Sequence, residues 1–211
     1  MKFKFISLLI LALMTIILSG CQNSKEQEEI MSLEVLTQKN AVIVIAFQGF
    51  QDFEYSEIRQ ILEYAGIKII IASSLKGEAQ GKSGQKVTVD MIIDEVVPED
   101  FDALVFIGGP GALEYVDNLS VHQLIQQAVN KDKVLAAICI APEILAQAGV
   151  LKEKKATVWS DPVDKSTIEV LEKGGAEYLD QAVVVDGKIV TGNGPEAATE
   201  FGQRIVEVLN K

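Results

Sequence analysis

The chain has 211 residues, of which 48% are hydrophobic and 23% are charged. This length and composition are typical of one globular domain with a substantial core. The formal net charge is −11, with the acidic residues spread along the chain. This charge argues against a nucleic-acid-binding protein, which needs clustered Lys and Arg to contact phosphates.

The first twenty residues have the pattern of a secretory leader, with a basic start and an apolar stretch that is too short for a comfortable membrane-spanning helix. The leader closes with LSGC, Leu18 to Cys21, which resembles the bacterial lipobox. That resemblance implies cleavage before Cys21, a lipid such as palmitate on this residue, and anchoring of the exported protein to the bacterial cell membrane. Residues 21–40 are rich in Gln, Glu, Lys and Ser and are predicted to form a polar tether.

Short apolar runs alternate with amphipathic segments from residue 41 to residue 211. The apolar runs predict strands over 41–47, 67–73, 102–109, 133–139 and 155–160. Helical spacing predicts helices over 54–66, 120–131, 142–151, 164–175 and 195–211, with Ser120 as the N-cap of the second. The glycine-rich stretch 76–86 is a loop or a hairpin, and 86–93 is an edge strand or a hairpin arm.

A further hairpin is predicted over 181–192, with Asp186 and Gly187 at its turn. The alternation of strands and helices along the chain indicates an α/β fold with a doubly wound, mainly parallel sheet over residues 41–211. In such folds ligands bind beyond the carboxyl ends of the strands, where the residues with reactive chemistry fall in this sequence.

Cys139 ends the apolar run VLAAIC, and Pro142 begins the helix that follows. One interpretation is a small buried hydrophobe. The other is a nucleophile at a sharp strand-to-helix turn, where the N-terminus of the helix would lower the pKa of the thiol. If Cys21 carries lipid, Cys139 is the only free thiol of the chain.

Two other strand ends carry candidate site residues. Gly108 and Gly109 in FIGGPGA either make a tight turn or offer backbone N–H groups to an oxyanion. Glu54 in QDFE opens a predicted helix, and its position alone favours an ordinary first-turn acid that interacts with the helix dipole.

The motifs QDFE, FIGGPGA, AAICIAP with AGVL, and DGKIVTGNGP occur in this order between about residues 41 and 209. Together they resemble the ThiJ/PfpI family of the DJ-one superfamily. The resemblance implies a flavodoxin-like sandwich, usually a homodimer, with Cys139 as the reactive cysteine. It also implies that protonated Glu54 donates a hydrogen bond to the thiolate, and that Gly109 and the N–H of Ile140 form the oxyanion hole.

The sequence departs from the family where histidines are expected. The peptidase-like branch carries a histidine directly after the cysteine, where this chain has Ile140. The deglycase-like branch carries one after the next short strand, at Trp159 or a close neighbour. The only histidine, His122, lies on a helix outside the predicted site. Peptidase or amidase chemistry is therefore not expected, because it needs a group that protonates the leaving amine.

Two functional hypotheses remain open. In the first, Cys139 and Glu54 serve a hydrolase or lyase that acts on small reactive aldehydes such as methylglyoxal or on their early protein adducts. The second is a non-enzymatic stress-response lipoprotein with a redox-sensing or chaperone-like role. The expected pocket includes Gly108, Trp159, Asn193 and Pro195, while Asp161 is an alternative acid at its mouth.

No cofactor is expected. One histidine and one available cysteine cannot build a zinc site of the usual kind, so no metal site is predicted. The sequence also lacks a phosphate-binding loop and a dinucleotide-binding fingerprint.

Overall fold

The computed structural model describes residues 38–211. The leader, most of the tether and Cys21 lie outside the described residues. A compact unit begins at Lys39 and runs to Lys211. No helix of the described part is both long enough and apolar enough to span a bilayer.

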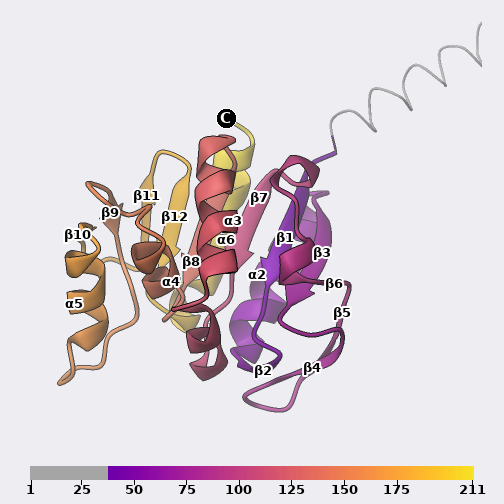
Figure 1. Cartoon of the computed structure of the whole chain (residues 1–211), viewed down its shortest axis with the longest axis horizontal. Helices are drawn as coiled ribbons and strands as arrows, with labels where there is room; N and C mark the ends of the chain where they lie inside the picture. Colours follow the sequence, from indigo (N-terminus) through magenta and orange to yellow (C-terminus); the bar gives the residue numbers. More distant parts are fainter. Residues whose placement is uncertain (1–37) are drawn as a thin grey trace, which may run out of the picture. The chain divides into compact units, whose positions relative to one another are not determined.

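A seven-stranded sheet forms the centre of this unit, in the order β11-β12-β8-β7-β1-β3-β6 (Figure 1). Its strands are β1 (Asn40–Val44), β3 (Lys68–Ser73), β6 (Met91–Ile92), β7 (Ala103–Phe106), β8 (Val134–Ile138), β11 (Val183–Asp186) and β12 (Ile189–Gly192). All neighbouring strands are parallel except β11, which runs antiparallel to β12. The predicted mainly parallel α/β sheet is thereby confirmed.

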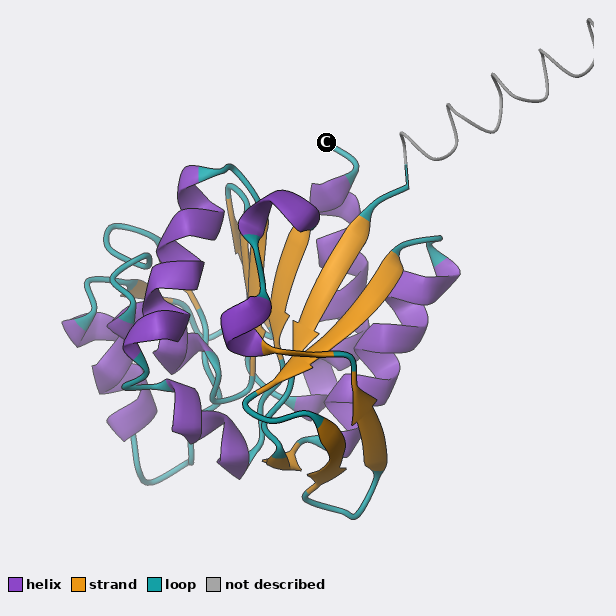
Figure 2. Ribbon diagram, turned by 45° about the vertical axis from the view of Figure 1, so that its right-hand side comes forward, coloured by secondary structure: helices purple, strands orange, loops and turns teal. Residues whose placement is uncertain are grey.

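Helices cover both faces of the sheet, as Figure 2 shows. The helices are α2 (Asp52–Tyr64), α3 (Leu119–Asn130), α4 (Pro142–Gln147), α5 (Ser166–Lys173) and α6 (Ala198–Leu209). Short 3-10 helices are η1 (Ile93–Glu95), η2 (Pro98–Asp100), η3 (Pro110–Tyr115) and η4 (Pro195–Ala197). Helices α2 and α6 contribute to one hydrophobic cluster, and α3, α4 and α5 contribute to the other.

The central strands are buried on both faces, which explains their continuous apolar sequences. In β1, Ala41 and Ile43 belong to the cluster beneath α2 and α6, while Val42 and Val44 belong to the opposite cluster. Successive side chains of a strand point to opposite faces, so a strand covered by helices on both sides has no solvent-facing position for a polar residue.

Three local predictions differ from the structure. The N-cap of α3 is Asn118 rather than Ser120, because the Asn118 side chain accepts the N–H groups of Ser120 and Val121. The 181–192 hairpin is confirmed, but its two-residue loop is Gly187 and Lys188. The strand predicted over 155–160 is only β9 (Lys155–Ala156), which pairs with β10 (Glu177–Tyr178) outside the main sheet.

The shortening of β9 has a visible cause. The N–H of Thr157 donates to the side-chain oxygen of Thr191, and the N–H of Trp159 donates to the carbonyl of Cys139. These donors are therefore unavailable for a strand ladder, and the segment instead runs alongside the end of β8.

The glycine-rich stretch forms a hairpin of β4 (Gly77–Gly81) and β5 (Lys86–Val89), which joins β2 (Gln48–Phe50) in a three-stranded sheet. Asp52 links the hairpin loop to the start of α2 by two hydrogen bonds. Its two carboxylate oxygens accept the N–H groups of Ser83 and Gln85, both at 2.8 Å. The loop 82–85 therefore has a fixed position beside the first turn of α2.

Candidate active site

Cys139 follows the last residue of β8 and has a left-handed backbone, with φ of 62°. Its N–H donates to the carbonyl of Gly192 at 2.9 Å, and its carbonyl accepts the N–H of Trp159 at 2.8 Å. A non-glycine residue adopts this conformation only where the surrounding structure holds it, and such residues cluster at functional sites. This geometry matches the sharp strand-to-helix turn expected of a nucleophile elbow.

Glu54 lies in the first turn of α2, and its side chain is completely buried. One carboxyl oxygen, Oε2, accepts the N–H of Gly108 at 3.0 Å. The other, Oε1, has no hydrogen-bond partner within residues 38–211. Glu54 is a first-turn acid, as its position indicated, but its complete burial with one oxygen unpaired is unusual for such an acid.

The Cys139 thiol and the Glu54 carboxyl influence each other's protonation. Burial raises the pKa of Glu54 to about 7, and the Gly108 N–H and the charge of Lys82 oppose this shift. Burial also raises the pKa of Cys139, and the Glu54 charge raises it further, whereas the N–H groups of Gly109 and Ile140 lower it. Two adjacent anions repel each other, so the buried pair carries at most one negative charge near neutral pH.

This result corrects the expectation that helix α4 lowers the pKa of the thiol. Removing the sulfur from water outweighs the nearby amides while Glu54 is ionised. When Glu54 is protonated its repulsion disappears, and the amides of Gly109 and Ile140 remain to stabilise a thiolate. The protonation state of Glu54 therefore affects the pKa of the Cys139 thiol.

Gly108 and Gly109 bring the backbone that follows β7 into direct contact with the backbone at the end of β2. The Gly108 carbonyl accepts the N–H of Gln51 at 2.9 Å. Gly109 has φ of 100°, and a Cβ there would lie 2.5 Å from the carbonyl oxygen of Gly49 and 2.6 Å from the nitrogen of Gln51. Only glycine fits this position, which keeps the amide of Gly109 beside the thiol.

A pocket of about 280 Å³ opens over the thiol. It is lined by Gln51, Lys82, Gly109, Pro110, Cys139, Ile140, Trp159 and Pro195. The structure thus brings together Cys139, both predicted oxyanion-hole residues, Trp159 and Pro195. Gly108, also predicted for the pocket, does not line it, and its N–H donates to the Glu54 carboxyl.

Asn193 lines a neighbouring cavity of about 770 Å³ instead of the thiol pocket. This cavity also includes Trp159 and Pro195, so these two residues form the boundary between the two spaces.

Neither alternative proton donor reaches the thiol pocket. The His122 ring contacts the carbonyl of Val116 at 2.7 Å, and His122 does not line the pocket. Asp161 accepts the N–H groups of Val163 and Asp164 within its own turn, and these bonds lower its pKa. Asp161 therefore does not replace the missing histidine. Glu54 does not line the pocket either, but its buried carboxyl interacts with the Cys139 thiol.

Lys82 and Gln51 line the pocket but were not identified from the sequence. Gln51 is the N-cap of α2, and its side-chain oxygen accepts the N–H of Phe53. Lys82 comes from the loop between β4 and β5, and no motif or spacing in the sequence links it to Cys139. Residues 38–211 contain no cluster of three or more side chains that could hold a metal ion.

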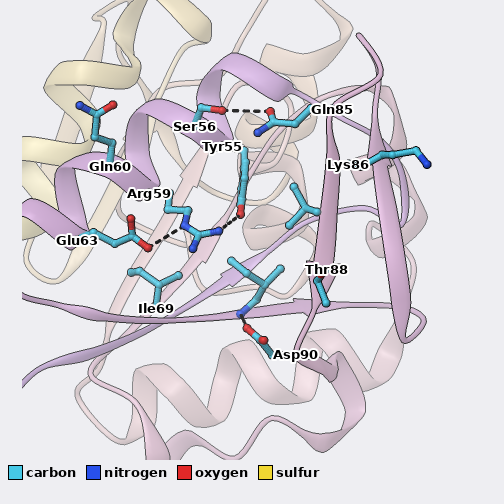
Figure 3. A pocket seen from close by; sticks show the side chains of 12 residues that line it. Tyr55, Ser56, Arg59, Gln60, Glu63, Ile69, Gln85, Lys86, Thr88 and Asp90 are labelled. Atoms are coloured by element: carbon cyan, nitrogen blue, oxygen red, sulfur yellow. Dashed lines mark hydrogen bonds and ion pairs between the residues drawn. The ribbon is translucent and has the colours of Figure 1, made fainter.

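A separate polar pocket of about 610 Å³ lies between α2 and the strands β3 and β5 (Figure 3). Its Arg59 is already paired, donating to the hydroxyl of Tyr55 at 2.6 Å and to the Glu63 carboxylate at 2.8 Å. None of the residues that line it lines the Cys139 pocket. This polar pocket is thus separate from the candidate site around Cys139.

The model of the DJ-1/PfpI family matches residues 39–208. The chain belongs to the DJ-1/PfpI family. This match confirms the family resemblance found in the sequence, and it covers the whole domain that carries Cys139 and Glu54.

Similar proteins occur in archaea and bacteria. An uncharacterised protein of Methanocaldococcus jannaschii is 40% identical over 206 residues, which are 96% of either chain. A deglycase of Thermococcus kodakarensis is 33% identical over 171 residues, covering 80% of this chain and 98% of the relative.

Solved structures of the family share the fold. A ThiJ/PfpI domain protein from Brachyspira murdochii has a TM-score of 0.77 at 34% identity, covering 82% of this chain and 98% of that one. DJ-1beta of Drosophila melanogaster has a TM-score of 0.73 at 29% identity, covering 82% and 91%. These neighbours confirm the predicted flavodoxin-like architecture.

Proposed function

We propose that this DJ-1/PfpI family protein is a cysteine-dependent hydrolase or lyase for small reactive aldehydes or their early adducts. The observation that carries the proposal is the strained Cys139 elbow, which opens into a small pocket with the buried carboxyl of Glu54 beside it. The similarity to a protein named deglycase, at 33% identity, supports the same class of chemistry.

The site supplies the groups that addition to an aldehyde requires. The Cys139 sulfur attacks the carbonyl carbon while Glu54 accepts the thiol proton, and a carbon–sulfur bond forms as the carbonyl π bond opens. The resulting oxyanion faces the N–H groups of Gly109 and Ile140 and then takes a proton from Glu54. This step needs no histidine, whereas amide hydrolysis needs a further acid for the leaving amine.

Replacing Cys139 by alanine is expected to reduce methylglyoxal consumption to the uncatalysed rate, because the bond-forming atom is removed. The measurement is the decay of methylglyoxal and the identification of its product with the detergent-solubilised full chain. His122→Gln is the matched control and should keep wild-type turnover, since His122 lies outside the pocket. Equal rates for wild type and Cys139→Ala would contradict the enzyme proposal and favour a role based on oxidation of the thiol.

We propose further that Cys21 is the lipid-carrying N-terminus of the exported chain. The support is the order of basic start, apolar stretch and LSGC in the sequence. Cys21→Ser is expected to move the protein from the membrane fraction to the soluble fraction of its cell, because stable anchoring depends on the acyl chains. Intact mass that shows an unprocessed, unmodified Cys21 in the wild-type protein would contradict this assignment.

A further inference from the structure

Among residues 38–211, Lys82 carries the only charged side chain that lines the Cys139 pocket. Its ammonium group makes no ion pair and no hydrogen bond with any residue from 38 to 211. By contrast, Lys86 on the same hairpin pairs with Glu78 at 2.7 Å. The rim of the pocket therefore holds a positive charge that the described fold does not neutralise.

The backbone of Lys82 is fixed at this place. Its N–H donates to the carbonyl of Phe50 at 2.8 Å, and the next residue, Ser83, is held by the Asp52 carboxylate. Gly81, which precedes it, lies so close to Asp52 that a Cβ would overlap the carboxylate. These backbone bonds place Lys82 at the pocket. None of them uses the ammonium group of its side chain.

The positive charge of Lys82 at the pocket is opposite in sign to the net charge of the chain. The chain has a net charge of −11, which repels small anions at long range. Within the site, Lys82 is close enough to lower the pKa of the buried Glu54. A negative group that enters the pocket therefore meets a local attraction that is opposite in sign to the effect of the net charge.

We propose that Lys82 forms an anion subsite at the rim of the Cys139 pocket and selects aldehydes that carry a carboxylate, such as glyoxylate. A carboxylate can accept a charge-assisted hydrogen bond from the ammonium group while the aldehyde carbon faces the sulfur. Ile140, Pro110 and Trp159 provide apolar walls, and a volume of about 280 Å³ fits a compound of a few carbons. The inference that such aldehydes are turned over rests on the proposed function. The inference that Lys82 attracts anions to the pocket does not.

The attraction is tested by alkylation of Cys139 with two reagents that differ in charge. The sulfur displaces iodide from iodoacetate, which is anionic, or from iodoacetamide, which is neutral, and in both cases a carbon–sulfur bond replaces the carbon–iodine bond. The ratio of the two rate constants cancels any change in the thiolate fraction. Mass spectrometry of the peptide containing Cys139 follows each reaction in the full chain.

Lys82→Gln is expected to lower the iodoacetate-to-iodoacetamide ratio about three- to tenfold, the size of an interaction between unit charges about 4 Å apart in a water-like dielectric, because Lys82 is exposed. Lys82→Arg should keep the ratio, and Lys86→Gln is the matched control that should leave it unchanged. Raising the salt concentration should lower the wild-type ratio toward that of Lys82→Gln. An unchanged ratio in Lys82→Gln would overturn the subsite.

A second readout separates this inference from the proposed function. In an active enzyme, Lys82→Gln is expected to lower kcat/KM for glyoxylate about three- to tenfold more than kcat/KM for neutral methylglyoxal. If neither aldehyde is consumed but the alkylation ratio still falls, the proposed function fails and the anion subsite stands. If both aldehydes are consumed, but Lys82→Gln changes neither the alkylation ratio nor the kcat/KM ratio of glyoxylate to methylglyoxal, the proposed function stands and the subsite fails.

Discussion

Replacing Glu54 by glutamine is expected to lower methylglyoxal turnover at pH 7 about 10²- to 10⁴-fold, the usual contribution of one general acid–base group. Glutamine has nearly the same shape and can still donate a hydrogen bond to the sulfur, but it cannot take a proton from the thiol or return one to the oxyanion. The measurement is kcat for methylglyoxal with each variant. Glu57→Gln, three residues later on the same helix and outside the pocket, is the control and should retain turnover.

The same substitution has a second signature in stability. The pKa of Glu54 is raised by burial from 4.5 to about 7, so folding favours the protonated carboxyl. This contribution is fully present below pH 4.5 and is lost as the pH rises through about 7. Relative to Glu54→Gln, the wild-type chain should therefore lose roughly 3 kcal/mol of unfolding free energy between pH 4 and pH 8. Urea unfolding at both pH values measures this loss of unfolding free energy. For the turnover experiment, a wild-type kcat in Glu54→Gln would contradict the catalytic assignment.

Replacing Gly109 by alanine is expected to lower the free energy of unfolding by about 2–5 kcal/mol. The left-handed backbone costs a non-glycine residue about 1–2 kcal/mol, and forcing extra atoms into a packed region costs about 1–3 kcal/mol more. At Gly109 the added Cβ meets the backbone of Gly49 and Gln51, neither of which is a flexible side-chain end.

Gly84→Ala is the matched control for this substitution. Gly84 has φ of 98°, close to the 100° of Gly109, but nothing lies within 4 Å of an added Cβ. Gly84→Ala should therefore show only the backbone effect, about 1–2 kcal/mol. Urea unfolding of both variants gives the two losses in unfolding free energy. The difference between them is the cost of the contact between the added Cβ at Gly109 and the neighbouring backbone. Equal losses at the two glycines would show that this contact costs nothing.

The sequence predicts the sheet well because its central strands are uniformly apolar. β1, β7 and β8 are buried on both faces, so their runs of Val, Ile, Leu and Ala leave no polar position that would hide the pattern. The failure at 155–160 has the opposite cause. There Thr157 and Trp159 donate to residues distant in the sequence, and local propensity does not reveal such partners.

The candidate site was predictable where backbone geometry determines it. Cys139 at a strand end and Gly109 in a glycine pair carry a visible signal, since both positions need an unusual turn. The burial of Glu54 and the direction of the thiol pKa carry no such signal, because both depend on what the fold places around these side chains. Lys82 is placed at the pocket by its N–H bond to Phe50 and by the Asp52 contacts of its loop, and these form between segments about thirty residues apart.

The most direct test of the account is the pH dependence of Cys139 alkylation by iodoacetamide in wild type, Glu54→Gln and Glu57→Gln. The ionised Glu54 carboxyl repels a thiolate, and the protonated carboxyl can donate a hydrogen bond to it, so removing this carboxyl must change the midpoint of the profile. We expect the Glu54→Gln midpoint to differ clearly from that of wild type and the Glu57→Gln midpoint to match wild type. The same midpoint in all three proteins would show that Glu54 and Cys139 titrate independently, and it would contradict the coupled pair on which the proposed chemistry depends.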